Sequence, residues 1–184
     1  DYIILIMEMI GTVAFAVSGA MTGIKRHMDL FGVNVLGITT AVGGGLIRDL
    51  ILGVKPPAMF RDSKYALTAI LTSTILFFII YIQHKSAEVK TSIWYDRLLL
   101  LGDTIGLGIF TVMGCYAAVK GGFVDNRFLT MFVGVLTGVG GGMIRDIMAG
   151  NTPYILVKHV YAVASLAGAM VFTFALPHFS QLTC

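Results

Sequence analysis

Two short motifs carry the residues that are best suited to chemistry. Each is a glycine triplet followed closely by an Arg-Asp pair, inside a long apolar stretch. The first motif contains Gly43, Gly44, Gly45, Arg48 and Asp49, and the second, 97 residues later, contains Gly140, Gly141, Gly142, Arg145 and Asp146. Charges in apolar surroundings are costly unless they are paired or hydrated. The motifs therefore indicate sites that handle ions or polar solutes.

The glycine triplets lower local helix stability by about 1 kcal/mol per residue relative to alanine. They also permit φ angles that other residues resist. We expect a kink or break at each triplet, which a membrane tolerates where the break is buried in protein or borders a watery cavity. The alternative is close helix packing through small residues.

Each motif also predicts one helix face, because residues at i, i+4 and i+8 lie on the same side of a helix. The two faces are Thr40, Gly44 and Arg48, and Thr137, Gly141 and Arg145. A stripe of hydroxyl, bare backbone and guanidinium is typical of a pore or cavity wall. The alternative is a pair of structural ion pairs between the halves, Arg48 with Asp146 and Arg145 with Asp49.

Glu8 and Asp103 are two further acids in apolar segments. With the two Arg-Asp pairs they make four acids and two arginines, which would favour cations in a water-filled path. We expect both acids near a possible ion path. Protonation, or a bond to a neighbouring helix, is the alternative for either acid.

Other chemistries lack support in the sequence. The histidines have no metal-ligand spacing, and phosphate-loop, hydrolase and metalloprotease motifs are absent. We therefore expect no metal, no cofactor and no enzyme. Basic residues form no run longer than Lys25-Arg26, so nucleic acid is not an expected partner.

The composition predicts the elements that position these residues. Of 184 residues, 57% are hydrophobic and 12% are charged, against about 25% charged in soluble domains. Mean hydropathy is +0.86. These values predict one all-α integral membrane domain over residues 1–184, with a retained N-terminal span. Six apolar stretches have the length of spanning helices: 2–21, 30–53, 65–82, 98–119, 128–150 and 160–176.

An internal repeat divides the six spans into two units. Besides the motifs at offset 97, Ile10-Gly11 matches Ile105-Gly106 at offset 95, and Glu8 then pairs with Asp103. The units are residues 2–82 and 98–176. Because each has three spans, the second must enter the membrane from the opposite side, as an inverted repeat. Basic residues number six on one side and five on the other, which weakly favours an N-terminus outside the cell.

Two three-helix units that each carry GGG-x-I-R-D resemble the prokaryotic branch of the trimeric intracellular cation (TRIC) channels. The segment SGAMTGIKRHMDLFGVNVLGITTAVGGGLIRDLILG is typical of that family. The resemblance implies a homotrimer in the plasma membrane of a prokaryote, surrounded by lipid. It implies passive conduction of monovalent cations, mainly potassium, through a pore in each subunit. The second and fifth helices, kinked at their glycines, would line that pore. The family has seven helices, whereas the sequence predicts six.

A glycine transporter label on related sequences provides a rival hypothesis. A helix N-terminus at a broken span can face a substrate carboxylate, which Arg48 or Arg145 could bind. This reading predicts a secondary transporter of glycine or another small amino acid. A non-conducting membrane scaffold is the third alternative.

Overall fold

The computed structural model describes residues 2–86, 93–157 and 159–180. Within these residues the chain is helical. The helices are α1 (Tyr2–Lys25), α2 (Leu30–Ile51), α3 (Ala58–Arg61), α4 (Lys64–Ser86), α5 (Ile93–Lys120), α6 (Arg127–Met148), α7 (Tyr154–Val157) and α8 (His159–Ser180). Six of them coincide with the six predicted spans, and the short helices α3 and α7 lie in the stretches between spans. The prediction of an all-α fold is confirmed.

Five helices of the described chain, α1, α2, α4, α5 and α6, are long and apolar enough to cross a membrane. In α8 the qualifying apolar stretch is shorter and covers Tyr161–Ala175. Backbone polar groups can be satisfied in lipid by helices, which explains why apolar stretches of this length fold as helices. The chain is a multi-pass membrane protein.

The repeat extends to the ends of α2 and α6. Asp29 caps α2 by accepting a hydrogen bond from the Gly32 amide, and Asn126, 97 residues later, caps α6 through the Leu129 amide. Side chains of this type satisfy amides that a helix start leaves without partners. Gly53 and Gly150 follow the two helices at φ of 71° and 69°, which favours glycine.

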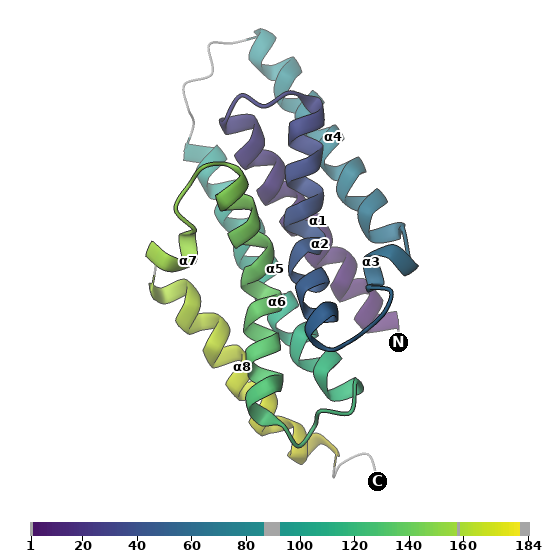
Figure 1. The fold of residues 1–184 in the computed structure, drawn as a ribbon. Helices are drawn as coiled ribbons and strands as arrows, with labels where there is room; N and C mark the ends of the chain where they lie inside the picture. Colours follow the sequence, from purple (N-terminus) through teal and green to yellow (C-terminus); the bar gives the residue numbers. More distant parts are fainter. Residues whose placement is uncertain (1, 87–92, 158, 181–184) are drawn as a thin grey trace.

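The helices of the two halves run in opposite directions (Figure 1). As drawn there, α1 and α4 run upward and α2 downward, whereas α5 and α8 run downward and α6 upward. Each of these helices is therefore antiparallel to its counterpart, as expected for an inverted repeat. The boundaries 2–82 and 98–176 stay predictions.

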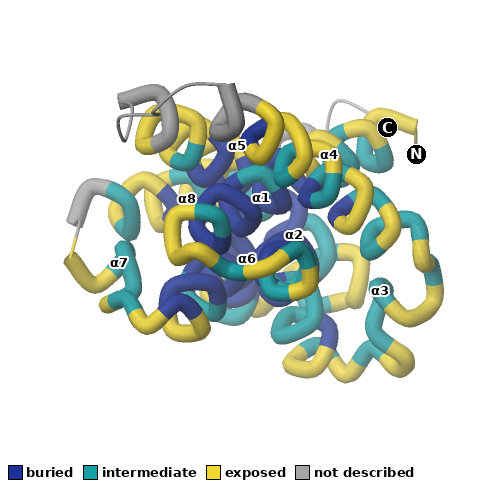
Figure 2. The backbone as a smooth tube through the Cα atoms, turned by 90° about the horizontal axis from the view of Figure 1, so that it is seen from above, coloured by how far each residue is buried: buried dark blue, intermediate teal, exposed yellow. Residues whose placement is uncertain are grey.

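The core lies where the two halves meet. There α1 packs on α5 and α2 packs on α6, with α4 and α8 on the flanks. Figure 2 shows the buried residues gathered in the centre of the bundle. Phe15 of α1 is 1% exposed and its ring lies 5.2 Å from that of Phe110 in α5. The outer surfaces are rich in exposed Leu, Ile, Val and Phe, as lipid-facing surfaces require.

The glycine triplets do not interrupt their helices. Both α2 and α6 continue as α-helix through the triplet and end several residues later. The expected break, with carbonyls freed at mid-span, is therefore wrong for this conformation. Intrahelical hydrogen bonding persists because tertiary packing outweighs the low helix propensity of glycine. A kink without interruption stays a prediction.

Candidate functional site

The middle glycine of each triplet lies at the crossing of α2 and α6. A Cβ on Gly44 would be 2.2 Å from the Thr137 carbonyl oxygen, and a Cβ on Gly141 would be 2.1 Å from the Thr40 carbonyl oxygen. No side chain fits at such separations. The reciprocal contacts show that glycine permits the two backbones to touch, in agreement with the close-packing alternative.

The predicted wall of threonine and glycine is packed in this conformation. Thr40 and Thr137 are at most 1% exposed, and each hydroxyl donates to a carbonyl of its own helix, at 2.6 Å. The Thr-Gly faces of α2 and α6 meet each other. Lining of a path by these residues stays a prediction.

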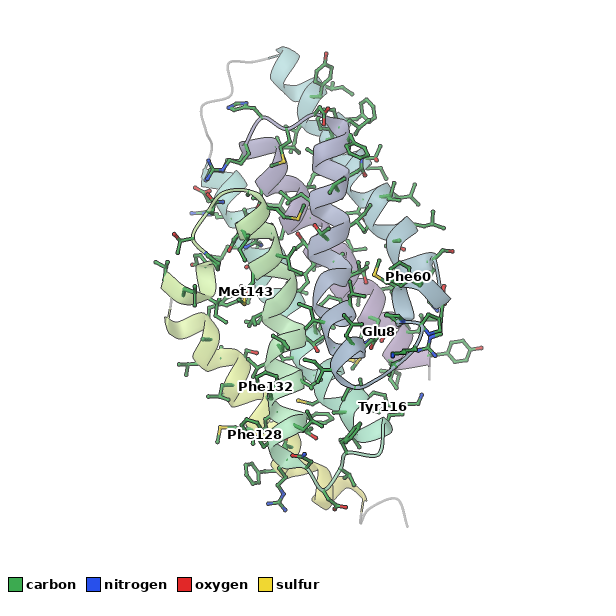
Figure 3. The ribbon with its side chains drawn as sticks, viewed as in Figure 1. Glu8, Phe60, Tyr116, Phe128, Phe132 and Met143 are labelled. Carbon is green, nitrogen blue, oxygen red and sulfur yellow. The ribbon has the colours of Figure 1, made fainter. Side chains whose placement is uncertain are left out.

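The Glu8 cluster, formed by Glu8, Arg48, Asp49 and Tyr65, lies at the lower end of α2. The Arg48 Nε donates to Asp49 Oδ1 at 2.8 Å, and the Ala58 amide donates to Asp49 Oδ2 at 2.7 Å. The Tyr65 hydroxyl donates to Glu8 Oε2 at 2.6 Å. Figure 3 shows Glu8 on the first part of α1, level with the loop between α2 and α3.

The Asp103 cluster is its counterpart at the upper end of α6 and consists of Ser18, Asp103, Arg145, Asp146 and Tyr161. Arg145 Nη1 lies 2.5 Å from Asp103 Oδ1, and Arg145 Nη2 lies 2.8 Å from Asp146 Oδ1. The Ser18 hydroxyl is bonded to both Arg145 and Asp103. The Tyr154 amide donates to Asp146 Oδ2 at 2.8 Å.

The alternative of ion pairs between the halves through the Arg-Asp motifs is wrong. Arg48 pairs with Asp49, and Arg145 pairs with Asp146 and Asp103. The motifs cannot reach each other because α2 and α6 are antiparallel and cross at their glycines, which leaves the arginines at opposite ends (Figure 1).

Two cavities end at these clusters. The Glu8 cavity has a volume of about 40 Å³ and is lined by the whole Glu8 cluster together with Gly45 and Phe110. A neighbouring pocket of about 310 Å³ shares Glu8 and Tyr65 with it and also contacts Lys64 and Lys120. The Arg145 cavity, of about 500 Å³, is lined by Lys25, Arg26, Arg145, Asp146, Asn151 and Tyr154.

Sequence reasoning missed several residues of the site. Tyr65 and Tyr161 are 96 residues apart, Phe15 and Phe110 are 95 apart, and Ser18 has no polar counterpart. The repeat offset itself was the signal that could have found the tyrosines and phenylalanines. Ser18 carries no such signal, because its role depends on α1 packing against the second half, where Ser18 contacts Asp103 and Arg145.

In the described chain no group of three or more His, Cys, Asp and Glu side chains is placed to hold a metal ion. The clusters instead combine guanidinium, carboxylate and hydroxyl groups at the ends of two cavities. Such an arrangement can bind or pass small polar solutes and ions.

Fold and site together define a multi-pass helical membrane protein with two oppositely directed three-helix halves and a charged cluster in each. A family model described as "Glycine transporter" matches residues 5–81 and 100–177. The chain belongs to this family, and the similarity to TRIC channels predicted from the motifs is confirmed by solved structures.

Curated relatives are bacterial membrane proteins. A UPF0126 membrane protein of Deinococcus radiodurans is 40% identical over 95% of this chain and 77% of its own length. The UPF0126 inner membrane protein YadS of Escherichia coli strain K12 is 36% identical over 93% of this chain and 80% of its own length.

Solved structures share the fold. The TRIC trimeric intracellular cation channel orthologue from Rhodobacter sphaeroides is 31% identical, with a TM-score of 0.85 over 97% of this chain and 86% of that chain. A structure described as the basis for conductance through TRIC cation channels is 39% identical, with a TM-score of 0.77 over 97% of this chain and 80% of that chain. The family and its structural neighbours are transport proteins and not enzymes.

Proposed function

We propose that this chain is a passive channel for monovalent cations, mainly potassium, with one path inside each subunit along α2 and α6. The likeness to channels described as TRIC cation channels supports the activity. The observation that carries the path is a pair of cavities, each ending at a charged cluster, at opposite ends of these two helices.

Charge in the clusters supports a preference for cations. Each cluster contains two carboxylates and one guanidinium, so each is net negative when all groups are ionised. Rings and clusters of carboxylates favour cations in water-filled paths. The Thr-Gly contacts between the cavities interrupt the path in this conformation, so conduction requires α2 and α6 to move apart there.

We also propose that the chain assembles as a homotrimer in a bacterial inner membrane, with its N-terminus outside the cell. The trimer is supported by the description of the Rhodobacter sphaeroides protein, and the membrane by the description of YadS. Association through lipid-facing surfaces would leave the path of each subunit intact.

Potassium efflux from proteoliposomes tests the proposed activity. Vesicles loaded with potassium chloride are diluted into N-methylglucamine chloride with a protonophore, and a pH-sensitive dye reports the proton influx that balances potassium efflux. We expect rapid quenching above that of protein-free vesicles. Sodium-loaded vesicles measure selectivity. Quenching no faster than in protein-free vesicles would contradict the channel.

Replacing glycine by leucine tests the path. Gly44→Leu should abolish or strongly alter the flux, since α2 and α6 touch at Gly44. Gly108→Leu is the matched control, because Gly108 is exposed and nothing lies within 4 Å of its added Cβ. Equal flux in both variants would place the path elsewhere.

Glycine transport is the second candidate, and the description of the matching family model favours it. A glycine carboxylate would have to displace an aspartate from Arg48 or Arg145. Saturable uptake of labelled glycine that is lost in Arg48→Ala would support the transporter. Absence of both potassium flux and glycine uptake would favour the non-conducting scaffold.

A further inference from the structure

Each half of the molecule contributes an acid from its first helix, an arginine from its second and a tyrosine from its third. The offsets between the equivalent residues are 95, 97 and 96. The two trios are Glu8, Arg48 and Tyr65, and Asp103, Arg145 and Tyr161. Because the trios come from repeated units, the acid of either trio can in principle bind its arginine or its tyrosine.

The two trios are bonded differently. In the first, Glu8 accepts a hydrogen bond from Tyr65 at 2.6 Å, and Arg48 is paired with Asp49. In the second, Asp103 is paired with Arg145 at 2.5 Å. The hydroxyl of Tyr161 is buried and has no hydrogen-bond partner.

Tyr161 lies close to Asp103, but the two side chains do not form a hydrogen bond of normal geometry. The Tyr161 hydroxyl and Asp103 Oδ1 are 3.9 and 3.7 Å from the point that a Cβ on Gly142 would occupy. Bare backbone at Gly142 therefore leaves space between the two groups. A buried tyrosine hydroxyl usually finds a partner, and Asp103 is the acceptor that the first half would predict.

Exposure differs with the bonding. Glu8, bound to tyrosine, lines two cavities. Asp103, bound to arginine, is 2% exposed, and the Arg145 cavity ends at Arg145 and Asp146 before it reaches Asp103. The acid of the acid-arginine pair is thus buried behind the wall of a cavity, whereas the acid of the acid-tyrosine pair lines a cavity directly.

From these differences we propose that the acid of each half exchanges between its arginine and its tyrosine, and that Tyr161 is the partner that receives Asp103 when the Arg145 cavity extends to that acid. The structure contains one half in each state. The role of this exchange as a gate rests on the proposed channel function and assigns Tyr65 and Tyr161 as positioning residues for the ion path.

Ser18 explains why the second half is the closed one. Its hydroxyl contacts both Arg145 and Asp103 and holds them together. The equivalent position in the second unit is Met113, which offers no comparable hydrogen bond to Arg48 and Glu8. Removing the Ser18 hydroxyl should therefore favour opening.

The test combines flux with an accessibility measurement. Thr22→Cys, in the wall of the Arg145 cavity one turn from Ser18 on α1, reports opening through its rate of reaction with a charged methanethiosulfonate reagent, with the parent protein as blank. In this background Ser18→Ala should raise the rate about 2- to 10-fold for each of the two hydrogen bonds that the Ser18 hydroxyl makes. Tyr161→Phe should lower the rate by a similar factor, because the open state then loses the hydrogen bond from the Tyr161 hydroxyl to Asp103.

Potassium flux, measured without the cysteine, should follow the same order: Ser18→Ala above the parent protein and Tyr161→Phe below it. Tyr65→Phe should also lower the flux, because Glu8 is then left with Arg48 as its partner. The matched control is Tyr81→Phe, since Tyr81 is 60% exposed on α4 and should change neither measurement.

Tyr161→Phe removes a hydroxyl that has no partner in this conformation, so the variant should fold like the parent protein. Any change in labelling rate then reports on the exchange. If Tyr161→Phe matches Tyr81→Phe in labelling rate, or reacts faster than the parent, the exchange is wrong. If the labelling rates follow the predicted order while the parent protein passes no potassium, the exchange stands and the channel function fails.

Discussion

At the scale of single residues, the aspartate of each motif ties a helix end to the following loop. Asp49 accepts hydrogen bonds from Arg48 and from the Ala58 amide at the start of α3. Asp146 does the same with Arg145 and the Tyr154 amide at the start of α7. These carboxylates therefore position the short helices that border the cavities, in addition to any effect on ions.

Replacing Asp49 tests this role. Asp49→Ala removes the acceptor for the Ala58 amide and the partner of Arg48, so unfolding free energy should fall by about 1–3 kcal/mol. Asp49→Asn keeps one oxygen that can accept from the Ala58 amide, so its unfolding free energy should fall by less than that of Asp49→Ala. Denaturant unfolding in detergent micelles measures both. Equal losses in the two variants would show that the amide contact contributes little.

At the scale of helices, the glycines of one triplet have different surroundings. Gly44 touches α6, whereas a Cβ on Gly45 would have its nearest neighbour 3.8 Å away, at Arg48 Nη2. The same contrast separates Gly141 from Gly142. The second glycine of each triplet is thus a contact residue, and the third is an open position beside the arginine.

This contrast predicts opposite effects of alanine. Gly44→Ala should lower the free energy of unfolding by about 1–3 kcal/mol, because the Thr137 backbone cannot yield without moving α6. Gly45→Ala should be neutral or raise it by up to about 1 kcal/mol through higher helix propensity. Unfolding in micelles compares the pair. Similar values for both would mean that α2 and α6 do not touch at Gly44.

At the scale of the whole molecule, the inverted halves place equivalent loops at opposite ends. The loop after α2 and the loop between α5 and α6 both lie in the lower half of the molecule as drawn in Figure 1, whereas the loops after α1 and α6 lie in the upper half. An odd number of spans per unit has this consequence in any membrane.

Single cysteines test the arrangement in intact cells and inverted vesicles, in a Cys184→Ser background; Cys115 is fully buried. Arg61→Cys and Asp125→Cys should react with an impermeant maleimide from the same side. Arg26→Cys and Thr152→Cys should react from the other side. Reaction of Arg61→Cys and Asp125→Cys from opposite sides would refute the inverted arrangement.

The membrane class, the six helices and the two motifs follow from the sequence alone. A bilayer requires long apolar stretches to be helical, and a repeated motif is visible as a fixed offset. The paired N-caps Asp29 and Asn126 show how far that offset reaches.

Tertiary structure decided what each motif does. A glycine triplet is compatible with a break or with close packing, and contact between Gly44 and the Thr137 carbonyl favours packing. Arg48 and Arg145 occupy equivalent positions, yet only Arg145 pairs with the acid of its first helix. That difference depends on distances between side chains far apart in the chain, and on Ser18 from the other half, which no local pattern encodes.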